Sequence, residues 1–115
     1  MILDLSKTRI FVRPGQTDLR KAVNGLSAIV QEKMKQDPFN GSVYIFCNRE
    51  RKLLKAVYWD KNGFWLNQKR LEKDRFPWPQ DEREVKELEA EQLLMLLAGI
   101  DFFKAHKALL YKIVA

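Results

Sequence analysis

The segment 53–71 constrains the fold more than any other part of the chain. It holds two runs of strand-like composition, 53–59 and 64–71, which are separated by the sequence DKNG at 60–63. An Asn-Gly pair between two such runs is a strong short-range signal for a β-hairpin, because these residues tolerate positive φ angles. A chain that contains this hairpin must build a sheet and must cover the apolar face of that sheet with other elements.

Two further strands and a long helix are expected before the hairpin. The runs 9–13 and 42–48 are rich in β-branched and aromatic residues, which is typical of strands. Between them, apolar residues recur at helical spacing and predict an amphipathic helix over 18–36. Thr17 precedes this pattern and is expected to be the N-cap of the helix. Pro14-Gly15 ends the first strand.

The C-terminal part of the chain predicts two shorter helices. The first is expected over 88–98 with Gly99 as its C-cap, and the second over 102–113 with Asp101 as its N-cap. The fold class is therefore predicted to be α+β. We expect a small antiparallel sheet of about four strands, covered on one face by one long amphipathic helix and two C-terminal helices.

Side-chain alternation in the hairpin predicts which of its residues are buried. Tyr58 shares a face of its strand with Leu54, whereas Lys55 points to the opposite face. We expect Tyr58 and Phe64 to be core residues. Lys55 on the strand and Lys61 at the turn are expected to be exposed.

Length and composition limit the class of protein. The 115 residues predict a single domain, 1–115, that is long enough to bury a core. No apolar run is long enough to span a membrane, and the first residues do not resemble a secretory signal. Cys47 is the only cysteine and His106 the only histidine, so we expect neither a disulfide nor a metal site, and no cofactor. The sequence indicates a cytoplasmic protein.

Charge is distributed unevenly along the chain. The formal net charge is +6, and the segment 49–75 holds nine bases and four acids, whereas 80–101 holds two bases and seven acids. A basic domain suggests a nucleic acid, an acidic protein or an anionic surface as its partner. Ordinary solvation of a Lys-rich surface explains the same pattern, and both interpretations stay open at this stage.

Several basic side chains are candidates for neutralising DNA phosphates. We name as candidate nucleic-acid-binding residues Arg20, Lys21, Arg49, Arg51, Lys52, Lys55, Lys61, Lys69, Arg70, Lys73 and Arg75. Trp59, Trp65 and Trp78 can stack on bases, but packing within a small core is the commoner use of tryptophan.

Groups suited to catalysis are scarce. His106 lies in an amphipathic segment among Ala and Lys, which is typical of a surface side chain. Cys47 lies inside a predicted strand, where a buried structural thiol is the usual finding. There is no glycine-rich loop to hold a phosphate. The sequence therefore predicts no enzyme activity and no catalytic residues.

Three separated motifs resemble a known family. They are PGQTDLRKAVNGL (14–26), DPFNGSVYIFCNRERKLLKAVYWDKNGFWL (37–66) and KRLEKDRFPWP (69–79), followed by a Leu-rich helix that ends in GID (99–101). In this order they resemble the accessory protein encoded by the second reading frame of the bacterial insertion sequence sixty-six family, often called TnpB. This family is distinct from the RNA-guided nuclease that carries the same name.

The resemblance implies a role in transposition of a bacterial mobile element. The family's strand-transfer chemistry is attributed to a separate, larger transposase, so no catalytic residues are implied here. Two hypotheses follow. The first is a non-enzymatic accessory factor that contacts DNA through the basic β-hairpin. The second is an adaptor that docks on the transposase or on other transposition proteins, or that self-associates as a homo-oligomer, without direct DNA contact.

Overall fold

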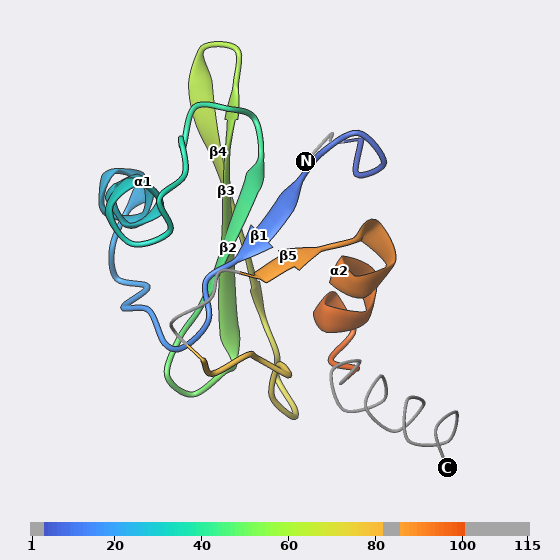
Figure 1. Cartoon of the computed structure of the whole chain (residues 1–115). Coiled ribbons are helices and arrows are strands. Elements are labelled where there is room, and N and C mark those ends of the chain that lie inside the picture. The colour runs from blue at the N-terminus through green and yellow to red at the C-terminus, as the bar shows by residue number, and fades with distance from the viewer. Residues whose placement is uncertain (1–3, 82–85, 101–115) are drawn as a thin grey trace.

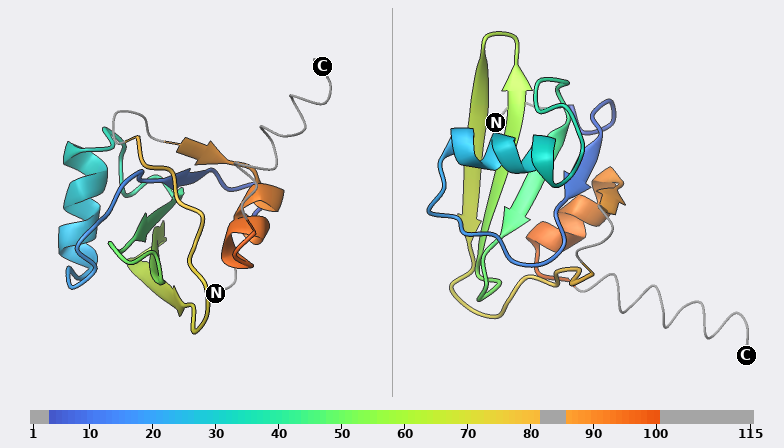
Figure 2. Two further views of the ribbon diagram at one scale, coloured as in Figure 1. Left: turned by 90° about the horizontal axis from the view of Figure 1, so that it is seen from below. Right: turned by 60° about the vertical axis from the view of Figure 1, so that its left-hand side comes forward.

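The chain builds a mixed β-sheet between two helices (Figure 1, Figure 2). The structure, a computed structural model, describes residues 4–81 and 86–100. The strands lie in the order β4-β3-β2-β1-β5. In chain order the elements are β1 (Ile10–Val12), α1 (Val23–Glu32), β2 (Val43–Cys47), β3 (Leu53–Asp60), β4 (Gly63–Arg70), β5 (Lys86–Leu88) and α2 (Ala90–Leu97).

The α+β class is confirmed, but the expected sheet needs two corrections. First, β1 and β2 are parallel neighbours, with Ile10 beside Val43, because the chain crosses back through α1 between them. Second, the sheet gains a fifth strand, β5, which pairs antiparallel with β1 and takes in Leu88. The sequence pattern places Leu88 in a helix, because a three-residue strand carries too little periodicity to be recognised.

The long helix is also shorter than predicted. It begins at Val23 instead of residue 18, and its N-cap residue is Ala22. Thr17 does not cap it, because its backbone N–H donates to the Cys47 carbonyl oxygen at 2.8 Å and its Oγ1 accepts from Arg13 Nη1 at 3.0 Å. Leu19 is buried from within a loop, which extended the apolar pattern beyond the true helix.

Each face of the sheet has its own apolar core. On one face Leu26 and Val30 of α1 pack on Phe11, Tyr44 and neighbouring residues. The expectation that the helices share one face is therefore wrong, because α2 covers the opposite face (Figure 2). That second core contains Ile10, Val12, Val43, Ile45, Cys47, Leu54, Ala56, Tyr58, Phe76, Trp78, Leu88, Leu93 and Leu96.

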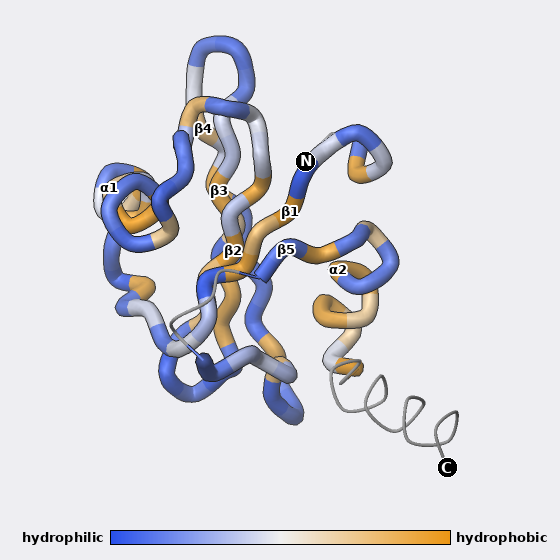
Figure 3. The backbone as a smooth tube through the Cα atoms, viewed as in Figure 1, coloured by the Kyte–Doolittle hydropathy of each residue, from blue (hydrophilic) through white to orange (hydrophobic). Residues whose placement is uncertain are grey.

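Burial follows from this layered arrangement. Every residue of β2 is buried, because the strand is central and both of its faces are covered. Figure 3 shows hydrophobic colour along the inner strands and α2, and hydrophilic colour at the hairpin tip and the turns. Tyr58 is buried as predicted, whereas Phe64 is only partly buried against the α1 core.

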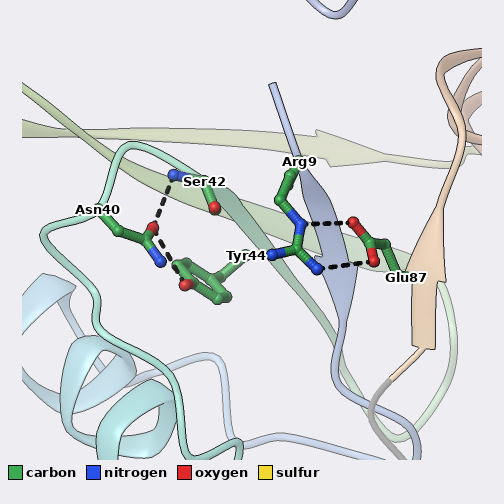
Figure 4. A network of polar contacts seen from close by, with 5 residues as sticks. All are labelled: Arg9, Asn40, Ser42, Tyr44 and Glu87. Carbon is green, nitrogen blue, oxygen red and sulfur yellow. Dashed lines mark hydrogen bonds and ion pairs between the residues drawn. The ribbon is translucent and has the colours of Figure 1, made fainter. Parts of the chain in front are cut away.

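Two polar networks hold β1 and β2 in place (Figure 4). Arg9 forms a bidentate ion pair with Glu87 of β5, with nitrogen–oxygen distances of 2.8 and 3.0 Å. The Tyr44 hydroxyl lies 3.1 Å from the Asp37 carbonyl oxygen and 3.2 Å from Asn40 Oδ1. The first network anchors the short edge strand, and the second anchors the loop that leads into β2.

The α2 helix has clear end signals. Glu89 and Gln92 form a capping box at its start. The C-cap residue is Ala98, one residue before the predicted Gly99, and Gly99 follows it with a φ of 77°. Within the described residues, no helix is both long and apolar enough to cross a membrane. The expected helix over 102–113, its N-cap Asp101 and His106 lie outside the described residues.

Candidate nucleic-acid interface

The loops that follow β1 and β2 leave the sheet at the same end, because these two strands are parallel. After β2, Asn48 shapes the turn: its Oδ1 accepts from the backbone N–H groups of Lys52 and Leu53 at 3.0 and 3.1 Å. Arg51 in this turn has a φ of 60°. Neighbouring parallel strands therefore bring the loops 13–22 and 48–52 together.

A cleft opens between these two loops. It has a volume of about 640 Å³ and is lined by Gln16, Thr17, Asp18, Leu19, Arg20, Asn48, Arg49, Glu50 and Leu53. A smaller pocket of about 300 Å³ shares Gln16, Asn48 and Arg49 with it and reaches Arg51, Trp78 and Gln80. Amide, hydroxyl, guanidinium and carboxylate groups thus line an open hollow that suits a polar ligand.

Arg20 and Asp18 form an ion pair on the rim of the cleft. Arg20 Nη2 lies 2.8 Å from Asp18 Oδ2, and Arg20 also donates from Nε to Asp18 Oδ1 at 3.0 Å. These side-chain hydrogen bonds lower the pKa of Asp18 to about 2 and raise the pKa of Arg20. Because the pair neutralises itself, Arg20 contributes less positive field to the cleft than Arg49 does.

Six of the predicted bases lie at this end of the sheet. Arg49, Arg51 and Lys52 are in the turn before β3, Arg70 ends β4 opposite Leu53, and Lys73 and Arg75 follow in the loop 71–75. Two backbone hydrogen bonds tie that loop to the turn, from Leu71 N–H to the Lys52 carbonyl (2.8 Å) and from Phe76 N–H to the Arg51 carbonyl (2.7 Å). We call these six residues the basic end.

The basic end is mixed in charge but positive overall. Three acids, Glu50, Glu72 and Asp74, lie in the same turn and loop as the six bases. All of the bases except Arg51 are exposed to solvent. In the cartoon the turn and the loop lie together at the lower end of the molecule, opposite the hairpin tip (Figure 1).

The remaining predicted bases lie elsewhere. Lys61 is exposed at the hairpin tip, and Lys21 is exposed just before α1, where its stem lies 3.0 Å from the place a Cβ on Gly25 would occupy. Lys55 is only half-exposed, which corrects the prediction, because its Nζ donates to the Leu19 carbonyl at 2.6 Å. Lys69 Nζ donates to the Leu97 carbonyl at the end of α2 at 2.6 Å.

The tryptophans divide between packing and exposure. Trp78 is buried and donates from Nε1 to the Arg13 carbonyl at 2.9 Å. Trp59 packs edge-on against Phe39 and against Phe64, each with a centroid distance of 5.0 Å. Trp65 is 48% exposed and stacks on Tyr58 at 6.4 Å. Only Trp65 keeps a large ring surface in solvent.

Sequence reasoning missed the polar residues inside the cleft. Asp18 falls within the predicted helix 18–36, Gln16 lies in the short segment before it, and Asn48 ends the predicted strand 42–48, so no local pattern marks the three as one site. The sequence signal that points to a loop is Pro14-Gly15, two residues after the end of β1, and Gly15 has a φ of 77° in the structure.

The described residues contain little that resembles a catalytic centre. They hold no group of three His, Cys, Asp or Glu side chains placed to bind a metal ion. Cys47 is buried, and burial raises the pKa of its thiol to about 12. A thiol with this pKa is a poor nucleophile at neutral pH.

The fold and the cleft define a small α+β domain with a mixed sheet and a positively charged end. The chain belongs to the family described as IS66 Orf2 like protein, whose model matches residues 8–107. This membership confirms the resemblance to the accessory protein of insertion sequence sixty-six, and it points to an accessory role in transposition.

Two proteins of Sinorhizobium fredii are similar to the chain. Uncharacterized protein y4hO is 37% identical over 94 residues, which covers 82% of each chain. Uncharacterized protein y4jC is 30% identical over 99 residues, which covers 86% of this chain and 85% of its own. No solved structure matches the chain significantly.

Proposed function

We propose that the chain is a non-enzymatic accessory protein of transposition that contacts DNA phosphates through the basic end. The observation that carries the proposal is the clustering of six bases beside an open polar cleft. The sequence predicts DNA contact through the whole hairpin, and the proposal places that contact at the base of the hairpin. The protein acts in the bacterial cytoplasm, with DNA and the element's transposase as its partners.

The arrangement of the bases favours contact with the phosphate backbone. Lys and Arg side chains that neutralise phosphates release counterions, so affinity falls steeply as salt rises. None of the three tryptophans lies among the residues that line the main cleft, so base stacking inside it is not part of the proposal. Binding should therefore depend weakly on DNA sequence.

Fluorescence anisotropy with a labelled DNA duplex at several salt concentrations tests the proposal. The test variant combines Arg49→Ala, Lys52→Ala and Lys73→Ala within the basic end. The control variant removes the same charge elsewhere, through Lys33→Ala, Lys35→Ala and Lys61→Ala, at three exposed positions. The test variant should lose affinity and reduce the slope of log K against log salt by about 0.9 for each lost phosphate contact. Absence of binding by the wild type at low salt, or equal losses in both variants, would refute the proposal.

A second candidate function is docking on another protein of the transposition machinery. It is favoured by two exposed apolar side chains on the α2 side, Leu94 (57% exposed) and Ile100 (52%). The acidic segment 80–91 precedes them in the sequence. Co-purification with the transposase after nuclease treatment separates the two functions. A complex that survives nuclease and is lost in Leu94→Glu supports docking, whereas a complex that disappears with nuclease was bridged by DNA.

A further inference from the structure

Strand β4 forms a long exposed edge of the sheet. It has eight residues, and β3 is its only neighbouring strand in the described part of the chain. Two of its apolar side chains are exposed, Trp65 (48%) and Leu66 (37%). The opposite edge, β5, has only three residues and is held by an ion pair. A long, partly apolar edge strand presents unpaired backbone groups to any other strand.

The hairpin geometry fixes which backbone groups of β4 point outward. The turn has two residues, since Asp60 pairs with Gly63, and Leu71 N–H donates to the Lys52 carbonyl at 2.8 Å. Gly63 and Leu71 are both odd-numbered, and the direction of the backbone hydrogen bonds alternates from residue to residue along an antiparallel strand. The N–H and C=O groups of the odd-numbered residues of β4 therefore point toward β3. The N–H and C=O groups of the even-numbered residues therefore point away from the sheet. These residues are Phe64, Leu66, Gln68 and Arg70.

We propose that β4 pairs antiparallel with β4 of a second copy of this chain, around a two-fold axis at Asn67. A two-fold axis perpendicular to the sheet leaves the two faces of the sheet unchanged. Even-numbered residues of one copy therefore lie opposite even-numbered residues of the other, and odd-numbered residues opposite odd-numbered ones. Leu66 then lies opposite Gln68 of the second copy, and Phe64 opposite Arg70. The N–H and C=O groups that point away from β3 thereby form hydrogen bonds with the second copy. The two five-stranded sheets then form one continuous sheet.

The sequence of β4 complements itself in this register. Its first half is apolar, with Phe64, Trp65 and Leu66, and its second half ends in Lys69 and Arg70. Antiparallel pairing sets the apolar half of each strand against the cationic half of the other, which suits contacts between cations and aromatic rings. The two Arg70 residues are then six residues apart along the strands, about 20 Å. Parallel pairing would instead place identical cations side by side, which is unfavourable.

Sedimentation velocity and cysteine cross-linking test this dimer. In the proposed register the two copies of Asn67 form a non-hydrogen-bonded pair with Cα atoms about 4.5 Å apart, a distance that a disulfide spans. Asn67→Cys should therefore cross-link under mild oxidation. Leu66→Cys and Gln68→Cys are matched controls, since each is one residue from the axis on the same strand. The native Cys47 is buried, so we expect it to cross-link little. The wild-type chain, which carries only this cysteine, measures the background of cross-linking.

The expected results are a wild-type dimer at micromolar concentrations, and a cross-linked fraction for Asn67→Cys on the order of tenfold above either control. A monomeric wild type overturns the proposal, whatever the variants do. Stronger cross-linking through Leu66→Cys or Gln68→Cys overturns the register. Neither result bears on DNA binding, which the anisotropy experiment measures separately.

Discussion

Tyr58 combines two opposite contributions to stability at the level of a single residue. Its ring is 3% exposed and stacks on Trp65, so it belongs to the α2-side core. Its hydroxyl is buried with no hydrogen-bond partner among the described residues. An unpaired buried hydroxyl costs about 1–3 kcal/mol, whereas the ring contributes more than that through burial.

Tyr58→Phe should therefore leave the free energy of unfolding unchanged or raise it by about 1 kcal/mol, because it removes only the unpaired hydroxyl. Tyr58→Ala should lower it by roughly 3–5 kcal/mol, since a large buried ring is lost. Urea denaturation of both variants measures the difference. A marked loss of stability in Tyr58→Phe would show that the hydroxyl has a partner in the folded protein.

Two lysines of the hairpin, Lys55 and Lys61, differ in their contribution to stability. Lys55 is half-exposed and reaches the Leu19 carbonyl, whereas Lys61 is exposed at the hairpin tip. Lys55→Ala should lower the free energy of unfolding by about 1–2 kcal/mol, because a charge-assisted hydrogen bond is lost. Thermal melting of both variants is the measurement, with Lys61→Ala as the control that stays near the wild type. Equal melting temperatures in the two variants would argue against the bond to Leu19.

At the level of elements, the hairpin turn carries backbone strain. Lys61 has a φ of 54°, in the left-handed region that favours glycine, while Gly63 has already entered β4. The turn therefore places its positive φ at its first residue, a position where two-residue hairpins of this kind prefer glycine. The Asn62-Gly63 pair predicts the turn correctly, but the residue with positive φ is Lys61, two positions before the glycine.

Lys61→Gly should raise the free energy of unfolding by about 1 kcal/mol, because glycine adopts this conformation without a steric penalty. Asn62→Gly is the matched control, since Asn62 is not among the residues with positive φ, and it should give no gain. Chemical denaturation of both variants tests the prediction. A loss of stability in Lys61→Gly would mean that the turn adopts a different conformation.

At the level of the whole molecule, two sets of core residues enclose the central strand β2. Cys47 ends this strand and is buried, and burial raises the pKa of its thiol from 9.0 to about 12. A raised pKa in the folded state means that the protonated thiol stabilises the fold. That contribution is fully present below about pH 9 and is lost as the pH rises toward 12.

The free energy of unfolding of the wild type should therefore fall between pH 9 and 12 more steeply than that of Cys47→Ala. Alanine creates a cavity and lowers stability at every pH, so the slopes and not the absolute values are compared. Urea denaturation at a series of alkaline pH values provides the slopes. Parallel curves for the two proteins would place the thiol in contact with solvent.

Local patterns predicted the hairpin, the α+β class, the burial of Tyr58 and, to within one residue, the C-terminal cap of α2. These features depend on residues close together in the sequence: alternation along a strand, a two-residue turn, and glycine after a helix. The basic segment was also visible from the sequence, and the structure brings six of its bases to one end of the sheet.

The sequence by itself thus determined the types of most elements and the family to which the chain belongs. Only the tertiary structure decided that β1 and β2 run parallel, that the helices cover opposite faces, and that Thr17 bonds to the end of β2 instead of capping a helix. It also removed Lys55 and Lys69 from the set of unpaired cations by giving each a backbone carbonyl. The physical reason is that these features depend on hydrogen bonds and packing between segments distant in the chain, which no local periodicity encodes.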